Sequence, residues 1–227
     1  MNLKSFGCSF IFGSELSDAV CVPGNVIPSK NTWPAHLARH LQATYTCFAR
    51  PGAGNLQILE QVLNQSANSN NSDLFVVNWT WIDRFDYYSS AAPNQNPWQT
   101  IMPVDTDNLA KIYYRDLHSE YRDKFTSLVY IKLAIDTLDQ KGIPFIMTYM
   151  DNLLFDQRWH TTPAVLDLQA YIKPRMTAFE EQTFLEWSRS HGYSETTAWH
   201  PLEEAHTAAG DYIIKVFDTR KTNDPTQ

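Results

Sequence analysis

Four short stretches of the chain are apolar without polar alternation, which is the pattern of strands covered on both faces. They are residues 3–10, 45–49, 73–80 and 143–150. Runs of this kind are typical of parallel sheets, because helices pack on both sides of such sheets. The pattern predicts a mainly parallel sheet of about five strands.

Between these stretches, apolar residues recur every three to four positions, as on one face of a helix. The periodic segments are residues 32–41, 56–63, 115–140, 176–189 and 202–217. Thr32 is suited to cap the first of them, and Gly142 follows the longest, where glycine commonly ends a helix. Strands that alternate with helices in this way predict a three-layer α/β/α sandwich.

Two segments break the alternation and are expected to be irregular loops. Residues 14–31 and 83–107 contain proline, glycine and asparagine and show little periodicity. Long loops inside a compact domain are usually functional. The sequence contains no linker or internal repeat, so we expect a single domain over residues 1–218 and a flexible tail over residues 219–227.

Composition excludes several classes of partner. The 227 residues include 18 basic and 25 acidic side chains, a formal charge of −7, with no basic run that would bind nucleic acid. The longest apolar stretch is far shorter than the ~18 residues of a membrane span, and the N-terminus lacks a signal-peptide pattern. Cys8, Cys21 and Cys47 are too widely spaced for a paired metal site. We expect a cytoplasmic protein with no nucleic-acid or membrane partner, and its oligomeric state stays open.

Small and polar residues gather where the predicted strands end. Ser9 ends the first strand, residues 52–55 follow the second, and Asn78 and Thr80 end the third. Pro201 suits the first turn of the last helix, which would make His200 its capping residue. Because ligands bind beyond the carboxyl ends of parallel strands, we expect these residues to meet at one edge of the sheet.

Ser9 and His200 together suggest nucleophilic catalysis. A serine hydroxyl attacks only when a base removes its proton, and the resulting oxyanion needs donors about 3 Å away. We expect Ser9 to attack and His200 to take and return the proton. Backbone N–H groups of the Ser9 turn and of the turn that holds Gly52 and Gly54 would bind the oxyanion. This chemistry needs no metal and no organic cofactor.

These residues resemble the conserved blocks of the SGNH or GDSL hydrolases. Phe6-Gly7-Cys8-Ser9 is similar to the first block, in which Gly-Asp-Ser supplies the nucleophile, with Cys8 in place of the aspartate. Residues 52–55 are similar to the second block, whose glycine donates an N–H group to the oxyanion. Gly52 and Gly54 both fit that glycine.

The third and fourth blocks depart further from the family. Asn78-Trp79-Thr80-Trp81 lies where the family has Gly-x-Asn-Asp, so Thr80 occupies the place of the oxyanion asparagine, with Asn55 or Asn78 as substitutes. His200-Pro201 resembles the end of Asp-x-x-His-Pro, but Thr197 replaces the aspartate. Glu195, Asp151 or a backbone carbonyl are the alternatives for orienting His200.

The resemblance implies a flavodoxin-like sandwich and the hydrolysis of esters, often acetyl or acyl groups on sugars or lipids. The leading hypothesis is a serine esterase acting on a small acyl ester, such as an O-acetyl carbohydrate, through Ser9 and His200. One alternative is a non-catalytic glycan-binding module on the same fold. Another is thiol chemistry through Cys8, although we expect Cys8 to be a small buried residue.

Other side chains have structural explanations. Aromatic residues near the third strand end are expected either to pack or to form a platform for a sugar ring. They are Trp79, Trp81, Tyr87, Tyr88 and Trp98. We expect Arg84 and Asp86 to form a surface pair. His206 is expected to be a half-buried structural histidine, and a metal site of His160, His200 and His206 is not favoured, because His200 and His206 do not share a helix face.

Overall fold

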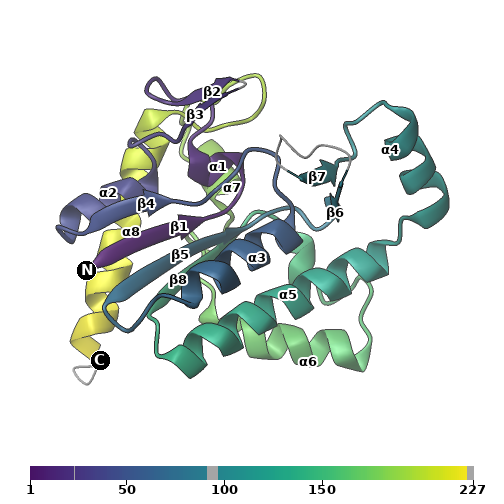
Figure 1. The fold of residues 1–227 in the computed structure, drawn as a ribbon. Helices are drawn as coiled ribbons and strands as arrows, with labels where there is room; N and C mark the ends of the chain where they lie inside the picture. The colour runs from purple at the N-terminus through teal and green to yellow at the C-terminus, as the bar shows by residue number, and fades with distance from the viewer. Residues whose placement is uncertain (23, 91–96, 224–227) are drawn as a thin grey trace.

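The computed structural model describes residues 1–22, 24–90 and 97–223, and a parallel sheet lies at its centre (Figure 1). In the described residues the sheet has four strands in the order β4-β1-β5-β8. These are β1 (Asn2–Phe6), β4 (Thr44–Cys47), β5 (Asp73–Trp79) and β8 (Phe145–Tyr149). Each falls in one of the apolar stretches of the sequence. The parallel sheet is therefore confirmed, with four strands instead of about five.

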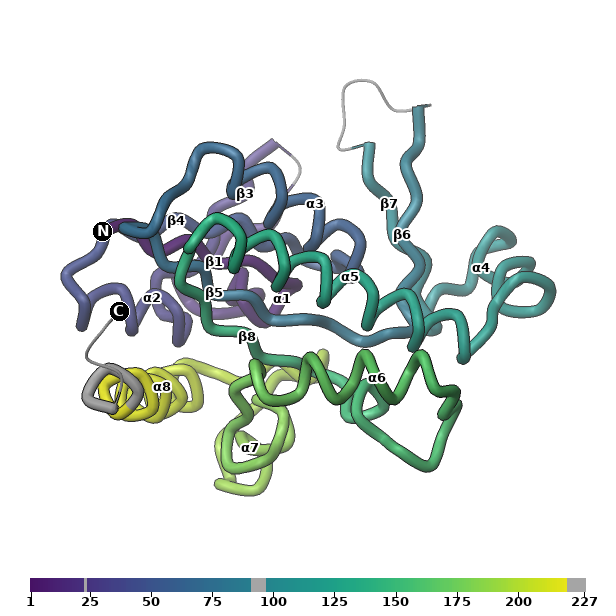
Figure 2. The backbone as a smooth tube through the Cα atoms, turned by 90° about the horizontal axis from the view of Figure 1, so that it is seen from below, coloured from purple at the N-terminus to yellow at the C-terminus, as the bar shows by residue number. Residues whose placement is uncertain are grey.

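Helices cover both faces of this sheet, as Figures 1 and 2 show from two directions. One face carries α3 (Asn55–Ser66), α5 (Glu120–Lys141) and α6 (Pro163–Ile172). The other carries α2 (Trp33–His40), α7 (Phe184–Ser190) and α8 (Glu203–Asn223). The predicted three-layer α/β/α sandwich is confirmed.

The central strand β5 explains why its stretch of sequence has no polar alternation. All seven of its residues are buried. Phe75, Val77 and Trp79 pack with α3 and α5, whereas Leu74 and Val76 pack with the helices of the opposite face. Because successive side chains of a strand point to opposite faces, a sheet covered on both sides favours apolar residues along the whole strand, and its buried polar residues, Asp73 and Asn78, need hydrogen-bond partners.

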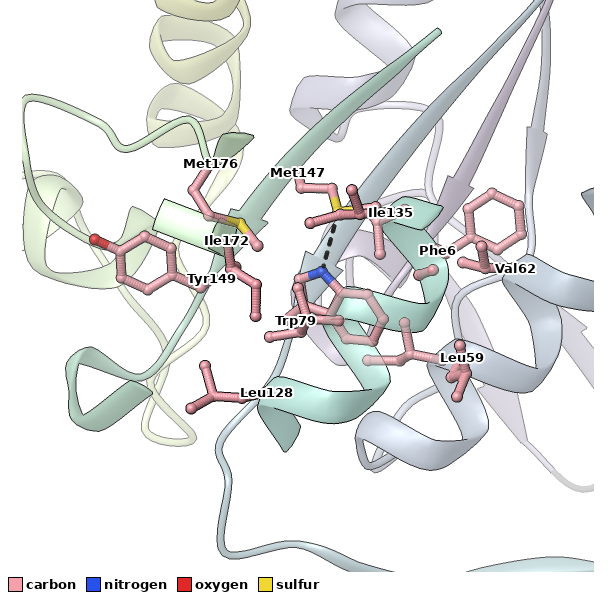
Figure 3. Packing of buried hydrophobic residues seen from close by; sticks show 14 of the residues in the cluster. Phe6, Leu59, Val62, Trp79, Leu128, Ile135, Met147, Tyr149, Ile172 and Met176 are labelled. Atoms are coloured by element: carbon pink, nitrogen blue, oxygen red, sulfur yellow. Dashed lines mark hydrogen bonds between the residues drawn. The ribbon is translucent and has the colours of Figure 1, made fainter. Parts of the chain in front are cut away.

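Trp79 lies in the core between the sheet and helices α3, α5 and α6. Figure 3 shows it among apolar side chains of both the sheet and the helices. Its side chain is fully buried, and its Nε1 donates to Met147 Sδ at 3.5 Å. Trp79 is thus a packing residue, and the expectation that it could belong to an exposed aromatic platform is wrong.

The segments expected to be loops contain two small antiparallel pairs. Residues 14–31 include β2 (Val20–Val22) and β3 (Asn25–Ile27), and residues 83–107 include β6 (Phe85–Tyr88) and β7 (Trp98–Ile101). The β6–β7 pair and α4 (Asn108–Ile112) project from the sandwich (Figures 1 and 2). Such projecting strands bury little of either face and so lack a clear hydrophobic period.

Helix boundaries also differ from the predicted ones. The helix α5 begins only at Glu120, where the Ser119 hydroxyl accepts from Arg122 N, because residues 113–117 form a separate π-helical turn, η1 (Tyr113–Leu117). The predicted helix over residues 176–189 is limited to α7, which starts at a capping box on Thr183. Helix α6 was not expected.

The remaining short elements are two 3-10 turns and one four-residue helix. The turns are η2 (Asn152–Leu154) and η3 (Lys173–Arg175), and α1 (Ser9–Phe12) is a four-residue helix. Helix α8 continues to Asn223, so residues 219–223, assigned from the sequence to a flexible tail, are helical. Residues 224–227 lie outside the described residues.

Two leucines on α5 test how much of the stability comes from the helix–sheet core. Leu138 is fully buried, whereas Leu133 is 45% exposed on the same helix. We expect Leu138→Ala to lower the free energy of unfolding by about 2–5 kcal/mol, because it leaves a cavity. Leu133→Ala should change it by less than about 0.5 kcal/mol. Urea denaturation measures both, and equal losses would contradict this packing.

Candidate active site

Ser9 lies just beyond the carboxyl end of β1, which ends at Phe6, so Ser9 follows the first strand instead of ending it as the sequence predicted. It is the first residue of α1, and its neighbour Cys8 takes the capping position before the helix. Ser9 is 7% exposed, whereas Cys8 is fully buried among the apolar residues between the sheet and helices α2, α7 and α8. The expectation that Cys8 fills space in the core is confirmed, which leaves Ser9 as the candidate nucleophile of this turn.

Gly13 ends α1 and turns the chain back on itself. Its φ is +75°, and a Cβ added there would lie 2.6 Å from both Ser29 Cβ and Thr32 Cγ2, so only glycine fits. Glu15 follows with a φ of +69°. The left-handed region costs a non-glycine residue about 1–2 kcal/mol, so neighbouring contacts must hold Glu15 in this conformation.

His200 comes to this turn from the other end of the chain. Its Nδ1 lies 2.6 Å from Glu15 Oε2, and its side chain is only 16% exposed. The imidazole packs edge-on against Phe10, with ring centroids 5.2 Å apart. His200 is not a helix cap, because Pro201 forms a β-bridge with Glu195 and α8 begins only at Glu203. That part of the prediction is wrong.

His200 thus lies against Phe10, the residue that follows Ser9 in the chain. In the described part of the chain, no hydrogen bond joins the Ser9 hydroxyl to the His200 ring. Catalytic hydrogen bonds are often long in enzymes without substrate and tighten only when it binds.

Neither carboxylate proposed from the sequence contacts His200. Glu195 binds Arg189 with both oxygens, at 2.9 and 3.0 Å. Asp151 accepts from the backbone N–H groups of Ile82 and Leu153, and burial raises the pKa of its carboxyl. Both alternatives are therefore wrong, and the carboxylate on His200 is Glu15. Sequence reasoning missed Glu15 because no motif marks it.

The turn that resembles the second block is occupied by a side chain of the protein itself. Asp86, 7% exposed, accepts from Gly54 N at 3.0 Å and from Gln57 N at 3.0 Å. A Cβ on Gly54 would lie 2.5 Å from the same carboxylate, so the close approach requires glycine. The Gly54 N–H group that could have bound an oxyanion is already used, and Gly52 is the glycine of this turn that is left for that role.

Asp86 also corrects the expected surface pair. Besides the backbone, its carboxylate accepts from Gln57 Nε2 and from Thr100 Oγ1, both at 2.7 Å. Arg84 instead donates to Ala53 O at 3.0 Å and stacks on Trp81, 4.9 Å from the ring centroid. The two residues therefore link different segments to the site, instead of forming a couple with each other.

The three polar candidates of the second and third blocks are built into the fold. Asn55 Oδ1 accepts from Thr80 N at 2.9 Å, and its Nδ2 donates to Thr80 O and Ser127 Oγ. Asn78 Nδ2 donates to Thr148 Oγ1 at 2.6 Å, between neighbouring strands. Thr80 is fully buried, and its hydroxyl has no partner among the described residues. Asn55 and Asn78 are therefore structural.

Two edge-on aromatic pairs lie at this end of the molecule, one at Phe10 and one on the hairpin of β6 and β7. The Trp81 ring meets Phe10 edge-on at 5.5 Å. Tyr88, 63% exposed, pairs with Trp98 at 5.6 Å on the projecting β-hairpin, where Trp98 Nε1 donates to Glu60. Residues 91–96, which belong to the segment predicted as a loop over residues 83–107, lie outside the described residues.

Neither His206 nor the hollow beside α6 adds a group to the site. His206 is fully buried, not half-buried, and its Nδ1 accepts from Trp33 N. In residues 1–22, 24–90 and 97–223, no cluster of three or more His, Cys, Asp or Glu side chains could hold a metal ion. A hollow of about 280 Å³ is lined by none of the candidate residues but by Phe155, Gln157, Gln169, Ala170, Lys173 and Pro174.

Comparison with known proteins gives the fold its context. No protein-family model and no curated protein matches the chain. A lipolytic protein of the G-D-S-L family from Veillonella parvula superposes with a TM-score of 0.55 at 14% identity, over 96% of this chain and 98% of that one. The chain has the fold of the G-D-S-L lipolytic proteins. The resemblance read from the sequence blocks is confirmed at the level of fold.

Other solved structures with the G-D-S-L fold are similar to the same extent. An acetyl xylan esterase from Butyrivibrio proteoclasticus has a TM-score of 0.53 at 13% identity, over 96% of this chain and 63% of that one. An esterase from Pseudoalteromonas sp., inhibited by monoethylphosphonate, has a TM-score of 0.52 at 8% identity, over 98% and 100%. In the described part of our chain, no helix has the length and apolar character needed to cross a bilayer.

The buried carboxylate under α3 generates a stability prediction. Asp86→Ala leaves two backbone and two side-chain donors without their acceptor, so we expect the free energy of unfolding to fall by about 3 kcal/mol or more. Asp211→Ala removes a surface carboxylate that pairs with His36 and should cost less than about 1 kcal/mol. Urea midpoints compare the two variants. A loss for Asp86→Ala as small as that for Asp211→Ala would contradict this contact.

His206 generates a pH prediction. Burial lowers the pKa of its imidazole from 6.5 to about 3, with His200 nearby adding to the effect. Below pH 6.5 the unfolded chain therefore binds a proton that the folded protein does not bind. As the pH falls, the free energy of unfolding decreases by up to about 1.4 kcal/mol per pH unit. His206→Gln should give a shallower loss between pH 6.5 and 5 in urea titrations, and an unchanged slope would show that His206 does not titrate in this way.

Proposed function

We propose that the protein is a serine esterase that hydrolyses small acyl esters, with Ser9 as nucleophile and His200 as general base and acid. One observation carries the proposal. The His200 imidazole packs on Phe10, the residue next to Ser9, at the carboxyl end of β1. The fold is shared with esterases, and in open parallel sheets this edge is where ligands bind.

In the proposed reaction, Ser9 Oγ attacks the ester carbonyl carbon while His200 Nε2 takes the hydroxyl proton. The tetrahedral intermediate then collapses, and His200 returns the proton to the departing alcohol. Water, deprotonated by His200, attacks the acyl-Ser9 ester and releases the acid and free Ser9. Each proton that His200 accepts is given back, so the cycle needs no cofactor.

The oxyanion is assigned to donors that the fold leaves free. We propose the backbone N–H groups of Ser9 and Gly52 for this role. The Thr80 hydroxyl, the side-chain donor expected from the sequence, is not assigned, because it is fully buried. Asn55, Asn78 and the Gly54 N–H group are not assigned, because each is engaged inside the protein.

An O-acetylated carbohydrate is the proposed substrate class. Two features support it. One structure with a similar fold is an acetyl xylan esterase, and the exposed Tyr88 with its partner Trp98 offers an aromatic surface on the projecting hairpin. Aromatic faces suit the apolar faces of sugar rings.

A glycan-binding module without catalysis is the second candidate. It is favoured by the lack of a direct Ser9–His200 hydrogen bond between these described residues and by Thr197, which replaces the usual acid. This candidate predicts sugar binding that weakens in Trp98→Ala, with no turnover of esters.

Hydrolysis of p-nitrophenyl acetate tests the esterase proposal. We expect Ser9→Ala to lower kcat by at least about 10³-fold, because the nucleophile is lost. Cys8→Ala is the matched control, one residue away in the same turn, and should retain the wild-type rate. Equal rates for wild type and Ser9→Ala would remove the proposal, and loss of activity only in Cys8→Ala would favour thiol chemistry.

A further inference from the structure

The acid that is missing beside His200 comes from a different segment of the chain. We propose that Glu15 is the positioning residue of the site, holding the His200 imidazole with Nδ1–H toward its carboxylate and Nε2 toward Ser9. This inference rests on the proposed esterase function and adds the residue that orients its base. Thr197, the position at which the SGNH resemblance expects the acid, is exposed to solvent.

The contact is made by geometry that fixes both partners. Glu15 Oε2 lies 2.6 Å from His200 Nδ1, and the same oxygen accepts from Thr196 Oγ1 at 2.6 Å. Hydrogen bonds to ionised groups are short and strong, which suits a carboxylate that orients an imidazole. With Nδ1–H donated to Glu15, the other ring nitrogen, Nε2, is left free to accept the hydroxyl proton of Ser9 when Ser9 attacks the ester.

Thr196 ties this carboxylate to the loop that carries the imidazole. Its Oγ1 accepts from His200 N at 3.2 Å, and its backbone N–H donates to His200 O at 2.9 Å. The loop between them is tight, with Trp199 at a φ of +64°. Thr196 therefore fixes His200 and Glu15 relative to each other.

The nucleophile and the proposed acid come from one short segment. Ser9 opens α1, Gly13 N donates to Ser9 O, and the left-handed turn at Gly13 brings Glu15 back over the site. The segment also binds elsewhere, since Ser17 N donates to Glu203 Oε1 at the start of α8. Glu15 and Ser17 of this segment thus bind the His200 loop and the start of α8, respectively.

The charges around His200 leave Glu15 as its ionised partner. The hydrogen bonds from Thr196 and His200 lower the pKa of Glu15, so it is a carboxylate at neutral pH. Two other titratable groups lie near this end of α8. His206 is neutral because burial lowers its pKa, and Glu203 accepts from Ser17. Glu15 is therefore the carboxylate that can accept the Nδ1–H group of His200.

The variant Glu15→Gln tests the inference by two independent readouts. The side chain keeps its size and is 44% exposed, so the fold should persist. We expect kcat for p-nitrophenyl acetate to fall about 10²- to 10⁴-fold with little change in KM. Proton NMR, with His200 assigned by His200→Gln, should show the Nδ1 proton of His200 far downfield in the wild type, because it is donated to a carboxylate, and should show the loss of that resonance position in the variant. Glu195→Gln, a carboxylate on the same loop that binds Arg189, is the control and should change neither.

The two readouts separate this inference from the proposed function. An unchanged Nδ1 proton resonance of His200 in Glu15→Gln overturns the contact, whatever the activity. A changed resonance with an unchanged kcat, in an active wild type, overturns the positioning role. A changed resonance in Glu15→Gln, when the wild type hydrolyses no ester, overturns the esterase proposal and supports the pairing of Glu15 with His200.

Discussion

Coverage of the central sheet on both faces is the constraint on which the rest of the structure depends. Every residue of β5 is buried, and β1 lies between two other strands of the sheet. A sheet of this kind has no face on which an unpaired polar group can reach water, and the buried Asn78 amide donates to Thr148 for this reason. Polar chemistry must therefore sit at the carboxyl edge, where Ser9 leaves β1 and the His200 loop arrives.

At that edge the protein has replaced parts of the site with its own side chains. Asp86 takes the Gly54 N–H group at the start of α3, and Asn55 holds the backbone of Thr80. These contacts stabilise the junction of the second and third strand ends, because buried donors are paired. They also leave fewer groups for a substrate oxyanion than the family pattern implies. The sequence departs from the family blocks at Cys8, Thr80 and Thr197. The hydrogen bonds of Asp86 and Asn55 lie at the same edge of the sheet as Cys8 and Thr80.

The sequence was sufficient for the features that depend on local pattern. Apolar runs located the strands of the sheet, and the alternation of strands with helices indicated the three-layer sandwich. Features set by tertiary contacts were not predictable. Glu15 reaches His200 only because Gly13 adopts a left-handed turn that no motif announces. Asp86 looked like a surface residue because its partner, the start of α3, lies far from it in sequence.

Labelling with a serine-reactive phosphonate, followed by peptide mapping, tests the central claim most directly. The reagent bonds only to a hydroxyl that a nearby base activates, so it reports nucleophile and base together. The account predicts one modified site, Ser9, and loss of labelling when His200 is replaced by glutamine. Modification of a different residue, or none in the folded wild-type protein, would contradict it.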